Sequence, residues 1–208
     1  MAGNMDSTLL SSGIYAGEFN LNESEETTHF SIVDEYGNAS SLTTTLNGSF
    51  GSGIIVDGAG FLLNNEMDDF SIQPGYPNMY GLIGGEANAV EPSKRMLSSM
   101  TPTILEKDGN LFMVLGTPGG STIITAVFQT IINVIDYDMN IEQAVNSPRF
   151  HHQWYPNEIK LEEDIAKDSN LIIQLKTMNH QLNFVSSMNR VDAILVKKNN
   201  YFGGADNR

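Results

Sequence analysis

The feature that most constrains the fold is one broad apolar face between residues 121 and 137. Large apolar side chains recur there at spacings of three and four residues, which is the period of an α-helix. The face consists of Ile123, Ile124, Val127, Phe128, Ile131, Ile132 and Ile135. We expect Ser121 to cap the start of this helix, with Gly119 and Gly120 just outside it. A face of this width needs a sheet or other helices to cover it, so the chain has to form a layered domain.

The other elements are expected to be mainly short strands joined by tight turns. Alternating or β-branched residues flank turn residues in two places, which predicts two β-hairpins. These are residues 28–33 with 39–46, and residues 103–106 with 111–115. Helices over 141–145 and 171–178 and a strand over 190–197 are expected to follow. Strands in hairpins, with the helices in the second half, indicate an α+β domain with antiparallel sheets.

Composition divides the chain at Thr27. Residues 1–26 are polar and end with three acids in the four residues Glu23–Glu26, so we interpret them as a flexible linker or the remnant of a larger subunit. Residues 27–208 are expected to form one domain with its own core. We recognise no signal peptide at the start, and no apolar run approaches the roughly 20 residues that cross a bilayer.

Net charge and cysteine content argue against several functions. The net charge of −14 repels phosphate groups, so binding to nucleic acids or to anionic membranes is not expected. With no cysteine, the chain has no thiol nucleophile, disulfide or thiolate metal site. His151 and His152 are candidate metal ligands, but neighbouring residues on a strand point to opposite faces. Packing or hydrogen bonding is therefore the better interpretation of this pair.

Three segments carry residue types that suit a binding or catalytic site. Thr27 opens the first expected strand after the acidic stretch, although threonine is also an ordinary strand former. Residues 64–70, NNEMDDF, concentrate carboxylates that suit an ammonium group or a metal, or else form a solvated turn. Residues 116–121, GTPGGS, form a tight turn before the helix, where backbone N–H groups favour negative charge. Taken alone, no segment decides between a functional and a structural interpretation.

Several motifs occur in one order along residues 27–208. They are TTHFS, TTTLN, NNEMDDFS, YGLIGGEANAVEP, LSSMTPT, GTPGGS, IDYDMNIEQAVNSPRFHHQW and GGADNR. In this order they resemble the small subunit of the γ-glutamyltransferases (glutathione hydrolases). The resemblance implies an N-terminal-nucleophile (Ntn) hydrolase fold, a four-layer αββα sandwich of antiparallel sheets, of which this chain supplies the C-terminal part.

The resemblance also implies that a precursor cuts itself between Glu26 and Thr27. Thr27 then becomes both the new N-terminus and the nucleophile. The freed α-amine has a pKa of about 7.7–8.0, so it can take the proton of the Thr27 hydroxyl. An internal threonine has no such amine, so the cut itself creates the base.

The other site residues follow from motif positions within the resemblance. Thr45 would orient Thr27, and the backbone amides of Gly119 and Gly120 would form an oxyanion hole. Asn47, Glu66 and Asp69 would contact an α-ammonium group of the substrate, and Ser98 and Ser99 would contact its α-carboxylate. Residues Pro74–Gly85 would form a lid over the site, with Tyr80 as its gate. The resemblance implies neither a metal nor a cofactor.

The implied reaction is cleavage of the γ-glutamyl amide bond of glutathione and related γ-glutamyl compounds through a γ-glutamyl ester on threonine. Water, an amino acid or a dipeptide then accepts the acyl group. The implied partner is the large subunit of the same precursor, in a heterodimer that is periplasmic or secreted. Two alternatives stay open: a related Ntn acylase acting on cephalosporins or poly-γ-glutamate, and an inactive pseudoenzyme that serves as a binding module.

The sequence departs from the family pattern at a few positions. Met96 stands where a proline is expected before LSS, and TTTLN has a threonine where an aromatic residue is common. A glycine expected near Met188 is missing from SSMNRVDAI. The family's arginine for the substrate carboxylate comes from the large subunit, so this chain does not supply it.

Overall fold

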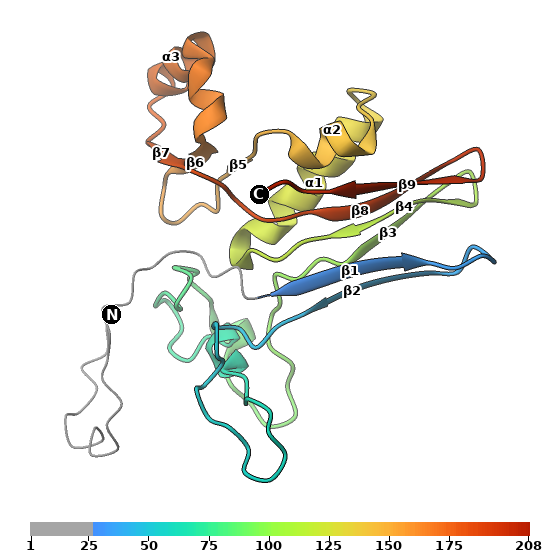
Figure 1. Cartoon of the computed structure of the whole chain (residues 1–208). Coiled ribbons are helices and arrows are strands. Elements are labelled where there is room, and N and C mark those ends of the chain that lie inside the picture. Colours follow the sequence, from blue (N-terminus) through green and yellow to red (C-terminus); the bar gives the residue numbers. More distant parts are fainter. Residues whose placement is uncertain (1–26) are drawn as a thin grey trace.

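A four-stranded antiparallel sheet lies at the centre of the computed structural model, which describes residues 27–208 (Figure 1). In spatial order its strands are β3 (Thr103–Lys107), β4 (Asn110–Gly116), β8 (Asp192–Lys197) and β9 (Asn200–Ala205). The expected second hairpin is confirmed as β3–β4, and the expected late strand as β8. The proposed linker, residues 1–26, lies outside the described residues.

Two helices cover one face of this sheet. They are α1 (Ile123–Ile135) and α2 (Ile141–Asn146), which lie above the sheet in Figure 1. Their buried side chains meet those of β4 and of residues 191–195 in one core. The core consists of Met113, Leu115, Ile123, Ala126, Val127, Val134, Ile141, Ala144, Val145, Val191, Ala193 and Leu195. Burial of these apolar side chains holds the helix layer on the sheet.

The long helix differs from the sequence-based expectation in two respects. It begins with a 3-10 turn, Gly120–Thr122, so Ser121 lies within that turn and Thr122 occupies the N-cap position of α1. The Thr122 hydroxyl donates to the Gly119 carbonyl at 2.8 Å, so the entry to the helix is fixed by Thr122. In addition, Ile124, Phe128 and Ile135 are 50–61% exposed, so the sheet covers only part of the predicted apolar face.

A β-hairpin packs on the other face of the sheet. β1 (Thr28–Val33) pairs with β2 (Ala39–Thr44), which confirms the first expected hairpin. A β-carbon at Gly116 would lie 2.3 Å from the His29 ring, so only glycine fits there. The Ser41 hydroxyl donates to the Leu115 carbonyl at 3.0 Å. These contacts hold the hairpin against the end of β4, beside the turn that leads into α1.

A smaller three-stranded sheet lies beside the helices. It contains β5 (Phe150–His151), β6 (Ile159–Glu162) and β7 (Leu182–Val185), with α3 (Ser169–Thr177) between β6 and β7. The helix α3 confirms the expected helix near residues 171–178. β6 and β7 are parallel, so the sheets are not antiparallel throughout as expected. A crossover connection through a helix is what permits two neighbouring strands to run in parallel.

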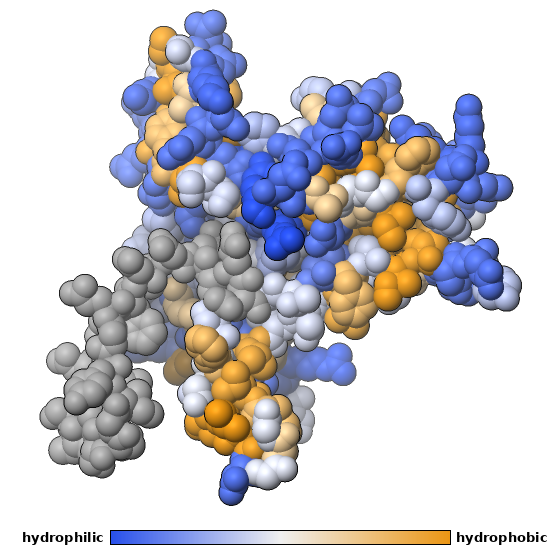
Figure 2. All heavy atoms as spheres, in the orientation of Figure 1, coloured by the Kyte–Doolittle hydropathy of each residue, from blue (hydrophilic) through white to orange (hydrophobic). Residues whose placement is uncertain are grey.

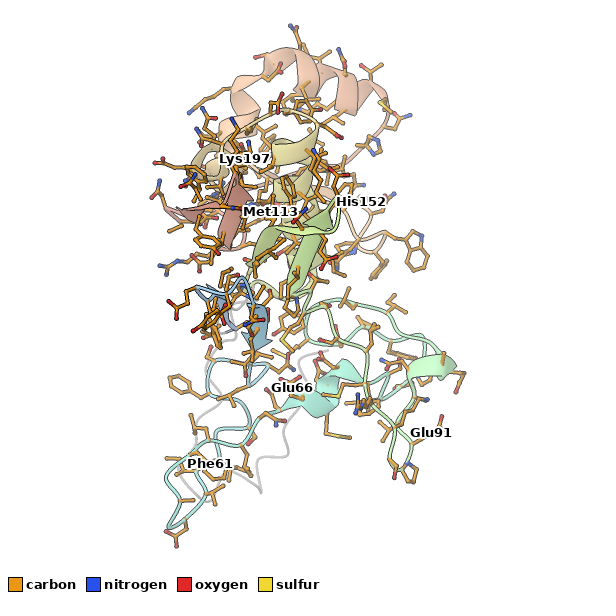
Figure 3. The ribbon with its side chains drawn as sticks, turned by 90° about the vertical axis from the view of Figure 1, so that its right-hand side faces the viewer. Phe61, Glu66, Glu91, Met113, His152 and Lys197 are labelled. Carbon is orange, nitrogen blue, oxygen red and sulfur yellow. The ribbon has the colours of Figure 1, made fainter. Side chains whose placement is uncertain are left out.

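Residues 45–102 are largely irregular and lie below the hairpin in Figure 1. They contain the 3-10 turns η2 (Glu66–Asp69) and η3 (Glu86–Asn88). We call residues 50–63 the arm; an isolated bridge joins Ile55 to Leu62 within it, and Phe61 lies on its projecting part (Figure 3). Among the described residues, no helix combines the length and apolar character needed to traverse a bilayer.

Candidate active site

One small cavity lies where the β1–β2 hairpin, the irregular segment and the start of α1 meet. Its volume is about 30 Å³, which is room for roughly one water molecule. It is lined by Thr27, Thr45, Asn47, Asp69, Tyr80, Leu82, Ser98, Ser99, Met100, Gly120 and Ile123. Eight of the ten site residues chosen from the sequence therefore line one cavity.

The other two chosen residues adjoin this lining. Gly119 directly precedes Gly120, and the Glu66 side chain shares a hydrogen bond with that of Asp69. Leu82, Met100 and Ile123 also line the cavity, and sequence patterns did not single them out as site residues. An apolar side chain carries no chemical signal that separates a cavity wall from the core.

The register of the hairpin brings Thr27 and Thr45 together. β1 and β2 pair Thr28 with Thr44, so the next residue on each strand lies at the same open end. The Thr45 Oγ1 accepts a hydrogen bond from the N–H of Asn47 at 2.9 Å. Thr27 is partly exposed, which suits a group that has to meet a ligand.

His29, two residues after Thr27, has a structural position. Its Nδ1 lies 2.8 Å from Thr43 Oγ1, and its Nε2 lies 3.0 Å from Ser31 Oγ. Burial lowers the pKa of His29, so its ring is predominantly neutral at pH 7. Both ring nitrogens are engaged within the hairpin, which leaves neither available to take a proton from Thr27.

Asn47 connects three parts of the site. Its φ of 73° lies in the left-handed region, which asparagine tolerates better than most residues. Its Nδ2 donates to the Asn65 carbonyl at 3.3 Å, and its own carbonyl accepts from the Tyr80 hydroxyl at 2.9 Å. The end of β2, the acidic segment and the expected lid therefore meet at this buried residue.

Glu66 and Asp69 form a pair of interacting carboxyl groups below the sheet, where Figure 3 labels Glu66. Burial, the negative charge of Asp69 and a hydrogen bond with Asp69 raise the pKa of Glu66 to about 7. Burial also raises the pKa of Asp69; the hydrogen bond with Glu66 opposes this rise, and the negative charge of Asp68 adds to it. Glu66 is therefore partly protonated near neutral pH, and a cation bound at the pair would favour release of that proton.

The turn between β4 and α1 has both of its glycines at positive φ, 130° for Gly119 and 57° for Gly120. Glycine adopts such angles without steric strain. The Gly119 carbonyl accepts hydrogen bonds from the hydroxyl and the backbone N–H of Thr122. Because a trans peptide is planar, the amide of Gly120 points away from that carbonyl. Gly120 is also the glycine of the turn that lines the cavity.

The expected lid, residues 74–85, lies against the cavity in a closed position. Tyr80 lines the cavity, and its hydroxyl bonds to the Asn47 carbonyl as described. The Tyr80 carbonyl accepts from Gln153 Nε2 at 3.5 Å, at the outer edge of hydrogen-bonding distance. Pockets for small molecules usually have volumes of about 300–1,000 Å³. The cavity bordered by this loop is smaller than such pockets.

Within residues 27–208, no group of three or more His, Cys, Asp or Glu side chains is arranged to hold a metal ion. His151 is buried, with its Nδ1 2.9 Å from Thr125 Oγ1 and its Nε2 2.9 Å from Gln153 Oε1. His152 is exposed. The two histidines thus differ in burial, as expected for neighbours in an extended segment.

The layers of this chain, a hairpin packed on one face of a sheet that carries helices on its other face, match the α+β fold of the Ntn-hydrolase class. A family model described as gamma-glutamyltranspeptidase matches residues 4–208. The chain belongs to the γ-glutamyltranspeptidase family.

Known relatives agree with this assignment. The glutathione hydrolase proenzyme of Escherichia coli (strain K12) is 54% identical over 166 residues, which make up 80% of this chain and 29% of that protein. A solved structure of a mutant γ-glutamyltranspeptidase from Helicobacter pylori has a TM-score of 0.83 at 52% identity, covering 86% of this chain and 98% of that one. A cephalosporin acylase from Bacillus halodurans, at 23% identity, a TM-score of 0.73 and coverage of 89% and 34%, shares the fold alone. The chain spans about a third of the length of the curated relatives it matches.

Proposed function

We propose that this chain carries the nucleophile-bearing small subunit of a γ-glutamyltransferase (glutathione hydrolase), which cleaves the γ-glutamyl amide bond of glutathione and related compounds. The observation that carries the proposal is the single cavity that Thr27 shares with Asp69, with the pair Ser98–Ser99 and with Gly120. A hydroxyl, a carboxylate, two further hydroxyls and a backbone N–H are the groups needed for a nucleophile, an ammonium site, a carboxylate site and an oxyanion hole.

The proposed reaction begins after self-cleavage between Glu26 and Thr27. The Thr27 oxygen attacks the γ-carbonyl carbon, and the freed α-amine takes the hydroxyl proton. The carbonyl electrons move to its oxygen, which the amides of Gly119 and Gly120 stabilise; a missing donor of this kind costs about 10²–10³ in turnover. Thr45 orients Thr27 throughout.

The intermediate then collapses to a γ-glutamyl ester. The C–N bond breaks, and the leaving amine receives the proton that the α-amine of Thr27 had taken. Water, or the amine of an amino acid or dipeptide, attacks the ester carbon while its own proton passes to the same α-amine. The C–O bond breaks, that proton returns to the Thr27 oxygen, and glutamate or a new γ-glutamyl amide is released.

Recognition of a free glutamyl head explains the choice of the γ-amide. Glu66, Asp69 and Asn47 are proposed to hold the α-ammonium group, with charge-assisted hydrogen bonds from the carboxylates. Ser98 and Ser99 are proposed to bind the α-carboxylate. An α-linked peptide has lost one of these two charged groups to an amide bond, so it leaves the matching side chains unpaired and is rejected.

Apolar surfaces of the described residues support a partner, which we propose is the large subunit of the same precursor. The arm exposes Phe50, Ile54, Ile55, Phe61 and Leu63, each at least 42% accessible. Figure 2 shows hydrophobic residues gathered over this arm. The outer face of α1 exposes Ile124, Phe128 and Ile135 in the same way. Exposed apolar surface on this scale marks interaction sites in soluble proteins.

Family resemblance further leads us to propose that the mature heterodimer is periplasmic or secreted. A leader peptide encoded upstream of this chain would support that location. A complete upstream subunit with a charged, leaderless start would contradict it.

The test of the proposed function uses the precursor, made from this chain together with the coding sequence that precedes it. We expect release of p-nitroaniline from γ-glutamyl-p-nitroanilide and none from the α-glutamyl isomer. Addition of a dipeptide should divert part of the product from glutamate to a γ-glutamyl peptide. The chain expressed without its upstream part is the matched control and should be much less active.

Other outcomes of that assay separate the alternatives. A precursor that matures but hydrolyses only cephalosporin side chains or poly-γ-glutamate would establish the acylase. A folded precursor that neither matures nor turns over any of these substrates would establish the pseudoenzyme. An upstream region that encodes no partner would contradict the proposed heterodimer.

Binding of the ammonium group is expected to strengthen as pH rises through about 7, the pKa of Glu66. Below this pH Glu66 is mostly neutral and attracts a cation weakly; above it, the carboxylate is charged. We expect the inhibition constant of L-glutamate to fall severalfold between pH 6 and pH 8. The limiting slope is tenfold per pH unit for one proton released.

The control for this pH dependence is Glu66→Gln. It should weaken glutamate binding at pH 8 and flatten the profile, because the amide does not titrate. Binding is measured rather than turnover, since the α-amine of Thr27 titrates in the same range. An unchanged inhibition constant from pH 6 to pH 8 in the unsubstituted protein would refute the expected loss of the Glu66 proton when the ammonium group binds.

A further inference from the structure

The segment Met188–Arg190, in the connection between β7 and β8 (Figure 1), contacts the glycine turn that precedes α1. Asn189 is 3% exposed and has a φ of 63°. Its side-chain Nδ2 donates to the Pro118 carbonyl at 2.9 Å. The backbone N–H of Arg190 donates to Thr117 Oγ1 at 2.9 Å. Two consecutive residues of this segment therefore bond to the turn.

The contact with Pro118 acts on the amide of Gly119, because the Pro118 carbonyl and the Gly119 N–H belong to one planar peptide group. In a trans peptide the two point in opposite directions. A donor that holds the carbonyl from behind therefore fixes the direction in which the N–H points. The Thr117 hydroxyl donates to the same carbonyl at 2.8 Å. Two donors on one carbonyl polarise the peptide and make its N–H a stronger donor.

Packing also prevents the Pro118–Gly119 peptide group from adopting another orientation. A β-carbon added at Gly119 would lie 2.0 Å from Asn189 Nδ2 and 3.1 Å from Thr122 Oγ1. The Asn189 side chain thus fills the space directly behind the glycine. Rotation of the Pro118–Gly119 peptide would break its hydrogen bonds with buried groups, which is costly.

Asn189 is itself held by buried charged residues. The backbone N–H of Met188 donates to Glu162 Oε1 at 2.7 Å, and its carbonyl accepts from Arg149 Nη1 at 2.8 Å. Arg149 is 2% exposed and Glu162 is 3% exposed. These hydrogen bonds to the N–H and the carbonyl of Met188 hold the backbone that precedes Asn189 in place.

We propose that Asn189 is a positioning residue that aims the Gly119 amide at the oxyanion, through its hydrogen bond to the Pro118 carbonyl. The inference rests on the proposed function, in which that amide stabilises the developing negative charge. Asn189 is not among the residues that line the cavity, so we expect it to affect stabilisation of the transition state and not binding of the ground state.

The test compares Asn189→Gly and Asn189→Asp in the matured enzyme acting on γ-glutamyl-p-nitroanilide. Glycine accepts a φ of 63° without strain but has no donor. Aspartate keeps the shape of asparagine, but when ionised it only accepts hydrogen bonds. We expect kcat to fall about 10–100-fold in both, as expected for a misdirected oxyanion donor, with KM and glutamate inhibition within about twofold.

The matched control is Asn179→Gly, the same substitution at a φ of 64° in an exposed turn after α3. It should leave kcat and KM unchanged. An unchanged kcat in either Asn189 variant, or a loss confined to KM, would overturn the positioning role. Failure of both variants to fold would overturn it too, since Asn189 would then serve the fold. An inactive unsubstituted precursor would instead refute the proposed function together with this inference.

Discussion

Replacing Thr27 with alanine is expected to leave the precursor uncut and without turnover. The substitution removes the hydroxyl that we propose attacks the bond after Glu26 and, in the mature enzyme, the γ-glutamyl carbonyl. Loss of a nucleophile lowers turnover by about 10⁶ in a serine protease, and we expect a comparable loss here. Mass spectrometry of the purified protein detects the cut, and p-nitroaniline release measures turnover.

Two variants serve as controls for this substitution. Thr27→Ser keeps a hydroxyl and should retain both cleavage and partial turnover. Thr28→Ala removes a neighbouring, exposed hydroxyl in β1 and should retain both fully. A cut before residue 27, or turnover, in Thr27→Ala would show that another residue is the nucleophile.

Replacing Arg149 with alanine is expected to lower the free energy of unfolding by about 3–5 kcal/mol, because it removes one partner of a buried ion pair. The Arg149 guanidinium donates to Asp206 Oδ2 at 2.5 Å and to the carbonyl of Met188 at 2.8 Å. The positive charge of Arg149 helps to keep the pKa of the Asp206 carboxyl low although burial would raise it. Among the described residues, Asp206 forms ion pairs with Arg149 and Arg208. Without Arg149, only the pair with Arg208 remains.

Urea unfolding followed by circular dichroism measures this effect. The control is Lys167→Ala, which breaks an ion pair with Asp164 whose two side chains are 79% and 64% exposed. Solvent and salt screen an exposed pair of this kind, so that variant should unfold close to the unsubstituted protein. Equal effects of the two substitutions would show that the buried cluster around Arg149 does not stabilise the fold.

Sequence patterns predicted the elements whose side chains alternate clearly between core and solvent. Thr28–Val33, the β3–β4 hairpin and α1 are of this kind. β9 was missed because it contains Gly203 and Gly204, which are poor strand formers. A β-carbon at Gly204 would lie 2.8 Å from the Ile141 side chain, so packing against α2 requires the glycine. β5 and β6 are too short, at two and four residues, to show a period.

Residue types alone left the site undecided, and resemblance supplied the roles. A threonine before a strand and an acidic turn are common, so each had an ordinary structural interpretation. The cavity lined by Thr27, Asp69 and Ser98 depends on contacts between segments far apart in the chain. Asn189 lies 71 residues from the carbonyl it binds, and no local pattern encodes such a pairing. Likewise, the helix pattern could not show that Phe128 faces outward.

The lid held over a cavity of about 30 Å³ has a kinetic consequence. In the proposed reaction, substrate entry and glutamate exit past Tyr80 would break the hydrogen bond from the Tyr80 hydroxyl to the Asn47 carbonyl. Loop opening of this type takes microseconds to milliseconds and limits turnover in many enzymes. Where opening is slower than the chemistry, kcat becomes insensitive to the basicity of the departing amine. The enzyme would then process structurally diverse γ-glutamyl amides at one common maximal rate.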